Sequence, residues 1–102
     1  MYAWGVNSCM VRLIVKFMSI ARQRAGTANV EFFSTSDRLG DVLKELVDRY
    51  KIADIMLSEE GDVRPWARVL VNGRSQQFIG GLNAELHDGD RIALIYPYTE
   101  NF

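Results

Sequence analysis

The sequence is poor in the residues that build disulfides and metal centres. Its 102 residues include one cysteine, Cys9, and one histidine, His87. A single cysteine excludes an internal disulfide and is typical of a reducing, intracellular setting. One residue of each kind is also too few for a zinc site of the His/Cys type. We interpret Cys9 as a free thiol and His87 as a loop residue beside Asp88, so the sequence predicts no catalytic residue, no metal site and no cofactor.

A long apolar run and an excess of one charge are missing as well. No stretch approaches the roughly 20 apolar residues that span a bilayer, and residues 1–9 lack the basic start and apolar centre of a signal peptide. We therefore expect a cytoplasmic protein. With 12 basic and 13 acidic side chains, the formal net charge is -1. The basic residues Arg12, Lys16, Arg22 and Arg24 thus favour an acidic protein partner over nucleic acid.

The length suits one domain with a modest core. We expect residues 1–9 to be an N-terminal extension, residues 10–97 to be the domain and residues 98–102 to be a C-terminal tail. No glycine-rich phosphate loop is present. Glu59, Glu60 and Asp62 lie in a segment with loop composition, where such acids are usually solvated and do not bind a cation.

Alternating apolar residues predict the strands. Val11, Leu13, Val15 and Phe17 share one face of a strand at residues 11–18. Residues 29–34 are its expected antiparallel partner. A third strand at residues 66–73 ends in an Asn72-Gly73 hairpin turn, residues 74–78 are a weak return strand, and residues 91–96 form the last strand. Trp66 is expected to anchor the core where the third strand begins.

A change of period predicts the main helix. Leu39, Val42, Leu43, Leu46, Val47 and Tyr50 recur at helical spacing. Ser36 or Asp37 is the expected N-cap, residues 52–58 are a possible second helix, and residues 19–28 are expected to be a connection. Gly80-Gly81 is interpreted as a bend. The order of elements predicts an α+β fold, the ubiquitin-like β-grasp, with a mixed sheet of four to five strands and one main helix packed on one face.

The face of the sheet away from this helix is a candidate partner surface. If the strands are oriented as above, Ile14, Met18, Leu70 and Ile95 point outward and form an exposed apolar patch. Scattered apolar residues on a surface are common, and a shift of register by one residue would bury these four instead.

Several segments together resemble one family: "VRLIVKFMSIARQRAG", "LGDVLKEL", "VLVNG" and "GGLNAELHDGDRIALI". In this order they are similar to the MoaD/ThiS group of ubiquitin-like sulfur carriers, above all to MoaD, the small subunit of molybdopterin synthase. The resemblance extends from Met10 to about Pro97. It implies a protein without catalytic residues of its own, whose C-terminal Gly-Gly is adenylated by an ATP-dependent activating enzyme, receives sulfur as a thiocarboxylate and enters a larger synthase subunit.

The tail departs from the family pattern. A count without gaps from Asp88 places Glu100 and Asn101 where the family has its diglycine, with Phe102 beyond. Glycine lacks a Cβ atom and can thread a narrow channel, so these side chains argue against thiocarboxylate formation. Since Pro97 cannot donate to the strand ladder, residues 98–102 are expected to be extended and poorly packed.

The resemblance thus implies a MoaD-like protein that docks to a larger subunit or an activating enzyme through its sheet face and its tail. At most it would be the sulfur-donating small subunit of a molybdopterin synthase. The alternative is a ubiquitin-fold interaction module without sulfur transfer. The candidate partner-binding residues are Met18, Leu70, Ile95, Tyr96, Pro97, Tyr98, Thr99, Glu100, Asn101 and Phe102.

Overall fold

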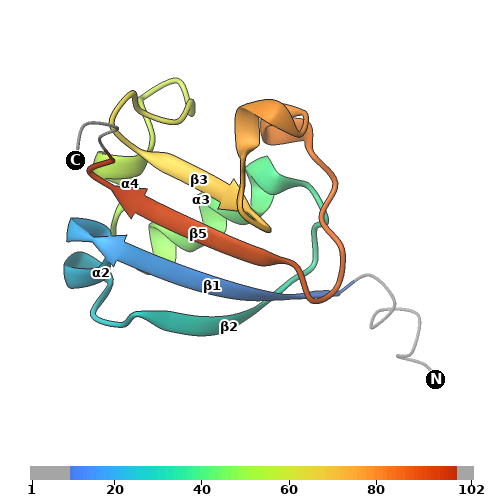
Figure 1. The fold of residues 1–102 in the computed structure, drawn as a ribbon. Coiled ribbons are helices and arrows are strands. Elements are labelled where there is room, and N and C mark those ends of the chain that lie inside the picture. The colour runs from blue at the N-terminus through green and yellow to red at the C-terminus, as the bar shows by residue number, and fades with distance from the viewer. Residues whose placement is uncertain (1–9, 99–102) are drawn as a thin grey trace.

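Five strands pair into one mixed sheet in the computed structural model, which describes residues 10–98 (Figure 1). The expectations for residues 1–9, including Cys9, and for residues 99–102 lie outside this range. The strands are β1 (Val11–Ser19), β2 (Asn29–Ser34), β3 (Arg68–Val71), β4 (Arg74–Ser75) and β5 (Arg91–Tyr96). Their order across the sheet is β2-β1-β5-β3-β4. The central strands β1 and β5 are parallel and every other neighbouring pair is antiparallel, which confirms the predicted mixed sheet.

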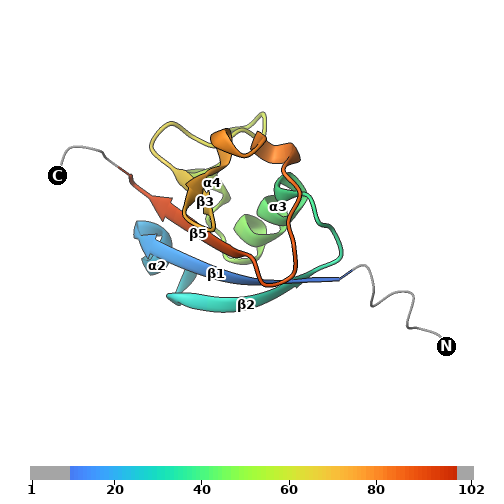
Figure 2. The same ribbon diagram turned by 45° about the vertical axis from the view of Figure 1, so that its right-hand side comes forward.

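Helix α3 (Leu39–Arg49) covers one face of this sheet, as Figure 2 shows. The predicted apolar stripe is buried on it, and Tyr50, just past its end, packs against Phe17 with ring centroids 5.0 Å apart. The inward residues of β1 are buried as well: Val11, Leu13, Val15 and Phe17. The core therefore lies between α3 and the inner face of the sheet, and the predicted α+β fold is confirmed.

The start of α3 corrects the predicted cap. Its N-cap is Arg38, with no side-chain cap hydrogen bond, and the first helical N–H, that of Leu39, donates to the backbone oxygen of Ala84 at 2.9 Å. Ser36 Oγ instead accepts from the Arg38 N–H and donates to Asp41 Oδ2. The cap prediction was wrong because a backbone partner distant in sequence meets the N–H that a side chain usually caps.

Two helical segments flank this core. The segment expected to be a connection contains helix α2 (Ile20–Ala25), which ends at Gly26 with φ 79°. Its only buried residue is Ala21. The sequence therefore shows no helical apolar period here, and the expectation of a plain connection was wrong. The predicted second helix is present as α4 (Ala53–Met56). Within residues 10–98, no helix has the length and apolar character needed to cross a membrane.

The hairpin after β3 forms as predicted, but its return strand is short. Asn72 and Gly73 both have positive φ, 52° and 86°, as a tight hairpin turn requires. Only Arg74–Ser75 pairs with β3; residues 76–78 form a 3-10 helix (η1, Gln76–Phe78) and not the expected strand. The predicted bend is present, with Gly80 at φ 112°, and leads into a second 3-10 helix (η2, Gly81–Asn83).

Helix α3 and η2 approach each other closely at Gly40. A Cβ atom at this position would lie 3.0 Å from the backbone oxygen of Leu82. The glycine that weakens the first helical turn in sequence terms is therefore needed for this close packing.

Trp66 is not the core anchor that the sequence predicts. Its side chain is 63% exposed, because the chain turns at Pro65-Trp66 and the next residue, Ala67, takes the buried position before β3. β3 therefore begins at Arg68, two residues later than expected.

Candidate partner-binding face

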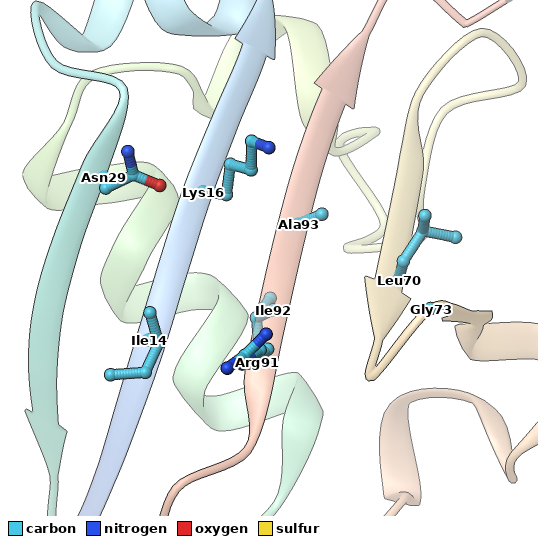
Figure 3. Close-up of a pocket in the computed structure, with 8 residues that line it drawn as sticks. All are labelled: Ile14, Lys16, Asn29, Leu70, Gly73, Arg91, Ile92 and Ala93. Carbon is cyan, nitrogen blue, oxygen red and sulfur yellow. The ribbon is translucent and has the colours of Figure 1, made fainter.

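The surface of the sheet opposite α3, here called the outer face, consists of the outward side chains of β1, β2, β3 and β5. The strand register places Lys16, Ala93 and Leu70 in one cross-strand row, since Lys16 pairs with Ala93 and Ala93 pairs with Leu70. Ile14 and Arg91 form the neighbouring row. Three strands that are separate in sequence thus contribute to one continuous surface (Figure 3).

A hollow of about 470 Å³ lies on this outer face. It is lined by Ile14, Lys16, Asn29, Leu70, Gly73, Arg91, Ile92 and Ala93. Ala93 has the smallest side chain in its row and lies on the central strand β5, between two longer side chains. In Figure 3 the short side chain of Ala93 lies between those of Lys16 and Leu70. Its small size leaves space at the centre of the sheet, and Gly73 also lines the hollow.

Of the predicted apolar patch, three members remain accessible and one does not. Ile14 and Leu70 are half-buried and Met18 is 37% exposed. Ile95 points outward but is only 8% exposed, so its expected exposure was wrong. It is flanked in register by Met18 on β1 and Arg68 on β3, and these longer side chains can cover it.

The chain leaves the sheet at the end of β5, beside the end of β1, where Tyr96 pairs with Ser19. Tyr96 packs partly against the core and Pro97 is exposed. Beyond the proline, the Tyr98 N–H donates to the backbone oxygen of Trp66 at 2.7 Å. The Arg68 guanidinium lies 4.7 Å from the centre of the Tyr98 ring. The expectation of a poorly packed tail was therefore wrong for Tyr98, while Thr99, Glu100, Asn101 and Phe102 lie outside the described residues.

The charged groups on this face are unequally engaged. Arg12 Nη1 pairs with Glu31 Oε2 at 2.7 Å, whereas Lys16 and Arg91 form no ion pair within residues 10–98. The basic stretch of the sequence is therefore divided: Lys16 faces outward on β1, and Arg24 on α2 instead pairs with Asp54.

Nothing in the described part of the chain resembles a catalytic or metal centre. His87 is 72% exposed, and its Nδ1 atom lies 3.9 Å from Asp90 Oδ2. No group of three or more His, Cys, Asp or Glu side chains in residues 10–98 is placed to hold a metal ion. The outer face and the exit of the tail are thus the features that remain as a candidate site.

Sequence reasoning found Met18 and Leu70 on this face but missed Lys16, Ala93 and Arg91 as parts of one site. The sequence signal for the hollow was one small residue, Ala93, within an apolar strand. Its meaning depends on which side chains flank it in the folded sheet.

A mixed sheet with a parallel central pair, one main helix on its inner face and an open outer face defines a ubiquitin-like β-grasp protein. The chain matches the ThiS family over residues 15–99 and belongs to that family, which confirms the resemblance seen in the sequence. It therefore belongs among the ubiquitin-like small modifiers and sulfur carriers.

Three relatives illustrate this membership. Small archaeal modifier protein 3 of Haloferax volcanii is 31% identical over 88 residues, which are 85% of this chain and 96% of that protein. The solution structure of the Haloferax volcanii HVO 2177 protein superposes with a TM-score of 0.76 at 29% identity, covering 91% of this chain and 89% of the other. A putative molybdopterin converting factor, subunit 1, from Pyrococcus furiosus gives a TM-score of 0.67 at 25% identity, covering 87% and 99%.

Proposed function

We propose that this chain is a MoaD-like small protein that docks to a larger subunit of molybdenum cofactor biosynthesis through its outer face and its C-terminal segment. The observation that supports it best is the hollow over Ala93, which lies on the same strand that leads into the tail. A partner seated on the outer face would meet the tail as it leaves the domain. The likeness to a putative molybdopterin converting factor subunit supports this choice of partner.

The test measures binding of the full chain to the large subunit of molybdopterin synthase, and separately to the activating enzyme, by isothermal titration calorimetry. Ala93→Trp fills the hollow and is expected to abolish or strongly weaken binding, because a large side chain there prevents close contact. Lys44→Ala is the control, since Lys44 is exposed on α3, on the other side of the sheet. If neither protein binds the wild-type chain, the proposal is wrong.

A second candidate is an interaction module that docks without carrying sulfur. It is favoured by Glu100 and Asn101, which stand at the family's diglycine positions in a count without gaps. The two candidates are separated by intact-mass spectrometry after incubation with activating enzyme, ATP and a sulfur donor. A mass increase equal to one oxygen replaced by sulfur would establish sulfur carriage, while an unchanged mass together with binding would support docking alone.

A further inference from the structure

The outer face is basic although the chain as a whole is slightly acidic. The strand register turns four basic side chains outward (Arg12, Lys16, Arg68 and Arg91) and one acidic side chain (Glu31), which gives this face a net charge of +3. The formal net charge of the whole chain is -1. The compensating acids therefore lie elsewhere; the exposed surface of α3, for example, carries three acids (Asp41, Glu45 and Asp48) against two bases (Lys44 and Arg49).

Two of the four cations remain available around the hollow. Arg12 is occupied by Glu31 at 2.7 Å, and Arg68 stacks on Tyr98. Lys16 and Arg91 are exposed and make no ion pair with any side chain in the described range. The acid nearest to Arg91 in sequence, Asp90, is engaged instead by the Asn72 amide and the His87 N–H.

Lys16 and Arg91 lie on two sides of Ala93. Lys16 is its cross-strand neighbour on β1, about 5 Å away between strands. Arg91 precedes it by two residues on β5, about 7 Å along the strand. Ile14 and Leu70 complete the apolar lining of the hollow. An apolar depression with cations on two sides has the shape and charge to receive an apolar side chain flanked by carboxylates.

We infer that the partner surface on the outer face is an acidic protein surface with one protruding apolar side chain, which seats over Ala93 while its carboxylates pair with Lys16 and Arg91. This inference rests on the proposed docking function and specifies the chemistry of the partner. Complementary charge of this kind speeds association and selects among partners. The buried apolar contact at the centre supplies most of the affinity.

Two other occupants are less well matched. Single-stranded nucleic acid would use the cations and would stack its bases on exposed aromatic side chains. The outward strand positions offer a single one, Phe33, at the edge strand β2, and the Tyr98 ring is already stacked on Arg68. A second copy of this chain could present the three exposed acids of α3. The apolar residues of α3, however, are buried in its own core, so this helix has no apolar side chain to seat over Ala93.

The experiment uses the full ¹⁵N-labelled chain and three synthetic peptides of equal length. The first carries one leucine flanked by aspartate and glutamate, the second has alanine in place of that leucine, and the third has lysines in place of the acids. Only the first peptide is expected to shift the backbone amide signals of Ile14, Lys16, Leu70 and Ala93. Ala93→Trp is expected to remove these shifts.

Charge reversal supplies the matched comparison. The double variant Lys16→Glu, Arg91→Glu is expected to weaken binding of the first peptide roughly tenfold, because two exposed ion pairs are replaced by repulsion. The double variant Arg22→Glu, Lys44→Glu makes the same change in net charge at exposed positions outside the outer face. It is expected to bind like wild type.

Other outcomes would overturn the inference. These are equal binding of all three peptides, no binding of the first, or unchanged affinity after charge reversal at Lys16 and Arg91. If a single-stranded oligonucleotide shifts the same amide signals and binds with higher affinity than the first peptide, the outer face would be assigned to nucleic acid. If the amide signals of both the outer face and α3 shift with the concentration of the chain in the absence of peptide, the outer face would be assigned to a second copy of the chain. If the synthase large subunit binds equally well after charge reversal, the inference fails while the proposed function stands.

Discussion

Leu43 lies on the side of α3 that packs against the sheet and is 1% exposed. We expect Leu43→Ala to lower the free energy of unfolding by about 2–5 kcal/mol, because it removes buried methyl groups and leaves a cavity. Urea denaturation followed by circular dichroism measures this loss. Lys44→Ala at the next, exposed position should change the same free energy by less than about 0.5 kcal/mol. Equal effects of the two substitutions would show that α3 does not pack as described.

Single residues show which sequence signals were reliable. The burial of Leu43 and of the inward residues of β1 could be predicted, because apolar residues recur every 3.6 residues in a helix and every 2 in a strand, and this spacing is visible in the local sequence. The exposure of Trp66 could not, because the chain turns at Pro65-Trp66 and Ala67 takes the buried position. The burial of Ile95 could not either, because it depends on the neighbouring strands. Ile95 is flanked by Met18 and Arg68, which are distant in sequence. Ala93 was missed for the same reason.

Helices α2 and α4 are joined by one charged contact. Arg24 Nη2 donates to Asp54 Oδ1 at 2.7 Å and to the backbone oxygen of Lys51 at 3.1 Å. This hydrogen bond holds the pKa of the Asp54 carboxyl below its ordinary value of 3.8. A lowered pKa in the folded state means that the contact stabilises the fold above pH 3.8, and that this contribution is lost as the pH falls through the lower folded value.

We therefore expect NMR titration of wild-type Asp54 to give a pKa below 3.8, and titration of Arg24→Gln to return it toward that value. The effect on stability should be small at neutral pH, because the pair is exposed to solvent. Arg22→Gln, on the same helix, is the control and should leave the pKa of Asp54 low. A titration that is the same in wild type and Arg24→Gln would contradict the contact.

At the same end of the sheet, where Tyr96 pairs with Ser19 just before α2, the segment after β5 is attached to β3 by Tyr98. Its N–H donates to the Trp66 oxygen, and its ring stacks on Arg68. An exposed cation–π contact contributes about 0.5–1 kcal/mol. Arg68→Ala should therefore speed solvent exchange of the Tyr98 amide roughly two- to fivefold, as measured by NMR. Arg74→Ala removes a strand cation opposite the far end of β3, away from Tyr98, and an equal increase in that variant would refute a specific role for Arg68.

The elements that sequence reasoning missed are those with little apolar pattern. Helix α2 buries only Ala21, and β4 pairs over two residues before the chain turns into η1. The N-cap of α3 was missed because Ala84, more than 40 residues later, accepts the Leu39 N–H. Strongly periodic elements were found, whereas elements defined by tertiary contacts were not, and the hollow belongs to the second class.

The parallel pairing of β1 and β5 decides what the whole molecule presents to a partner. It brings the end of β5 beside the end of β1, so that the chain leaves the sheet near Met18 and Arg68. Helix α3, whose exposed surface carries three acids and two bases, lies on the opposite side of the sheet. One side of the molecule thus combines positive charge, an apolar hollow and the start of the tail, and a single partner can contact all three.

Photo-crosslinking tests this arrangement in the proposed complex with the synthase large subunit. A photoreactive phenylalanine analogue is placed at Leu70 beside the hollow, at Tyr98 in the tail, or at Lys44 on α3. The positions at Leu70 and Tyr98 should both crosslink to the large subunit, because the outer face and the tail exit lie on the same side of the sheet. The position at Lys44 should not. Crosslinking from Lys44 alone would mean that the partner docks on the helical side, whereas crosslinking from Tyr98 alone would mean that the tail binds without the outer face.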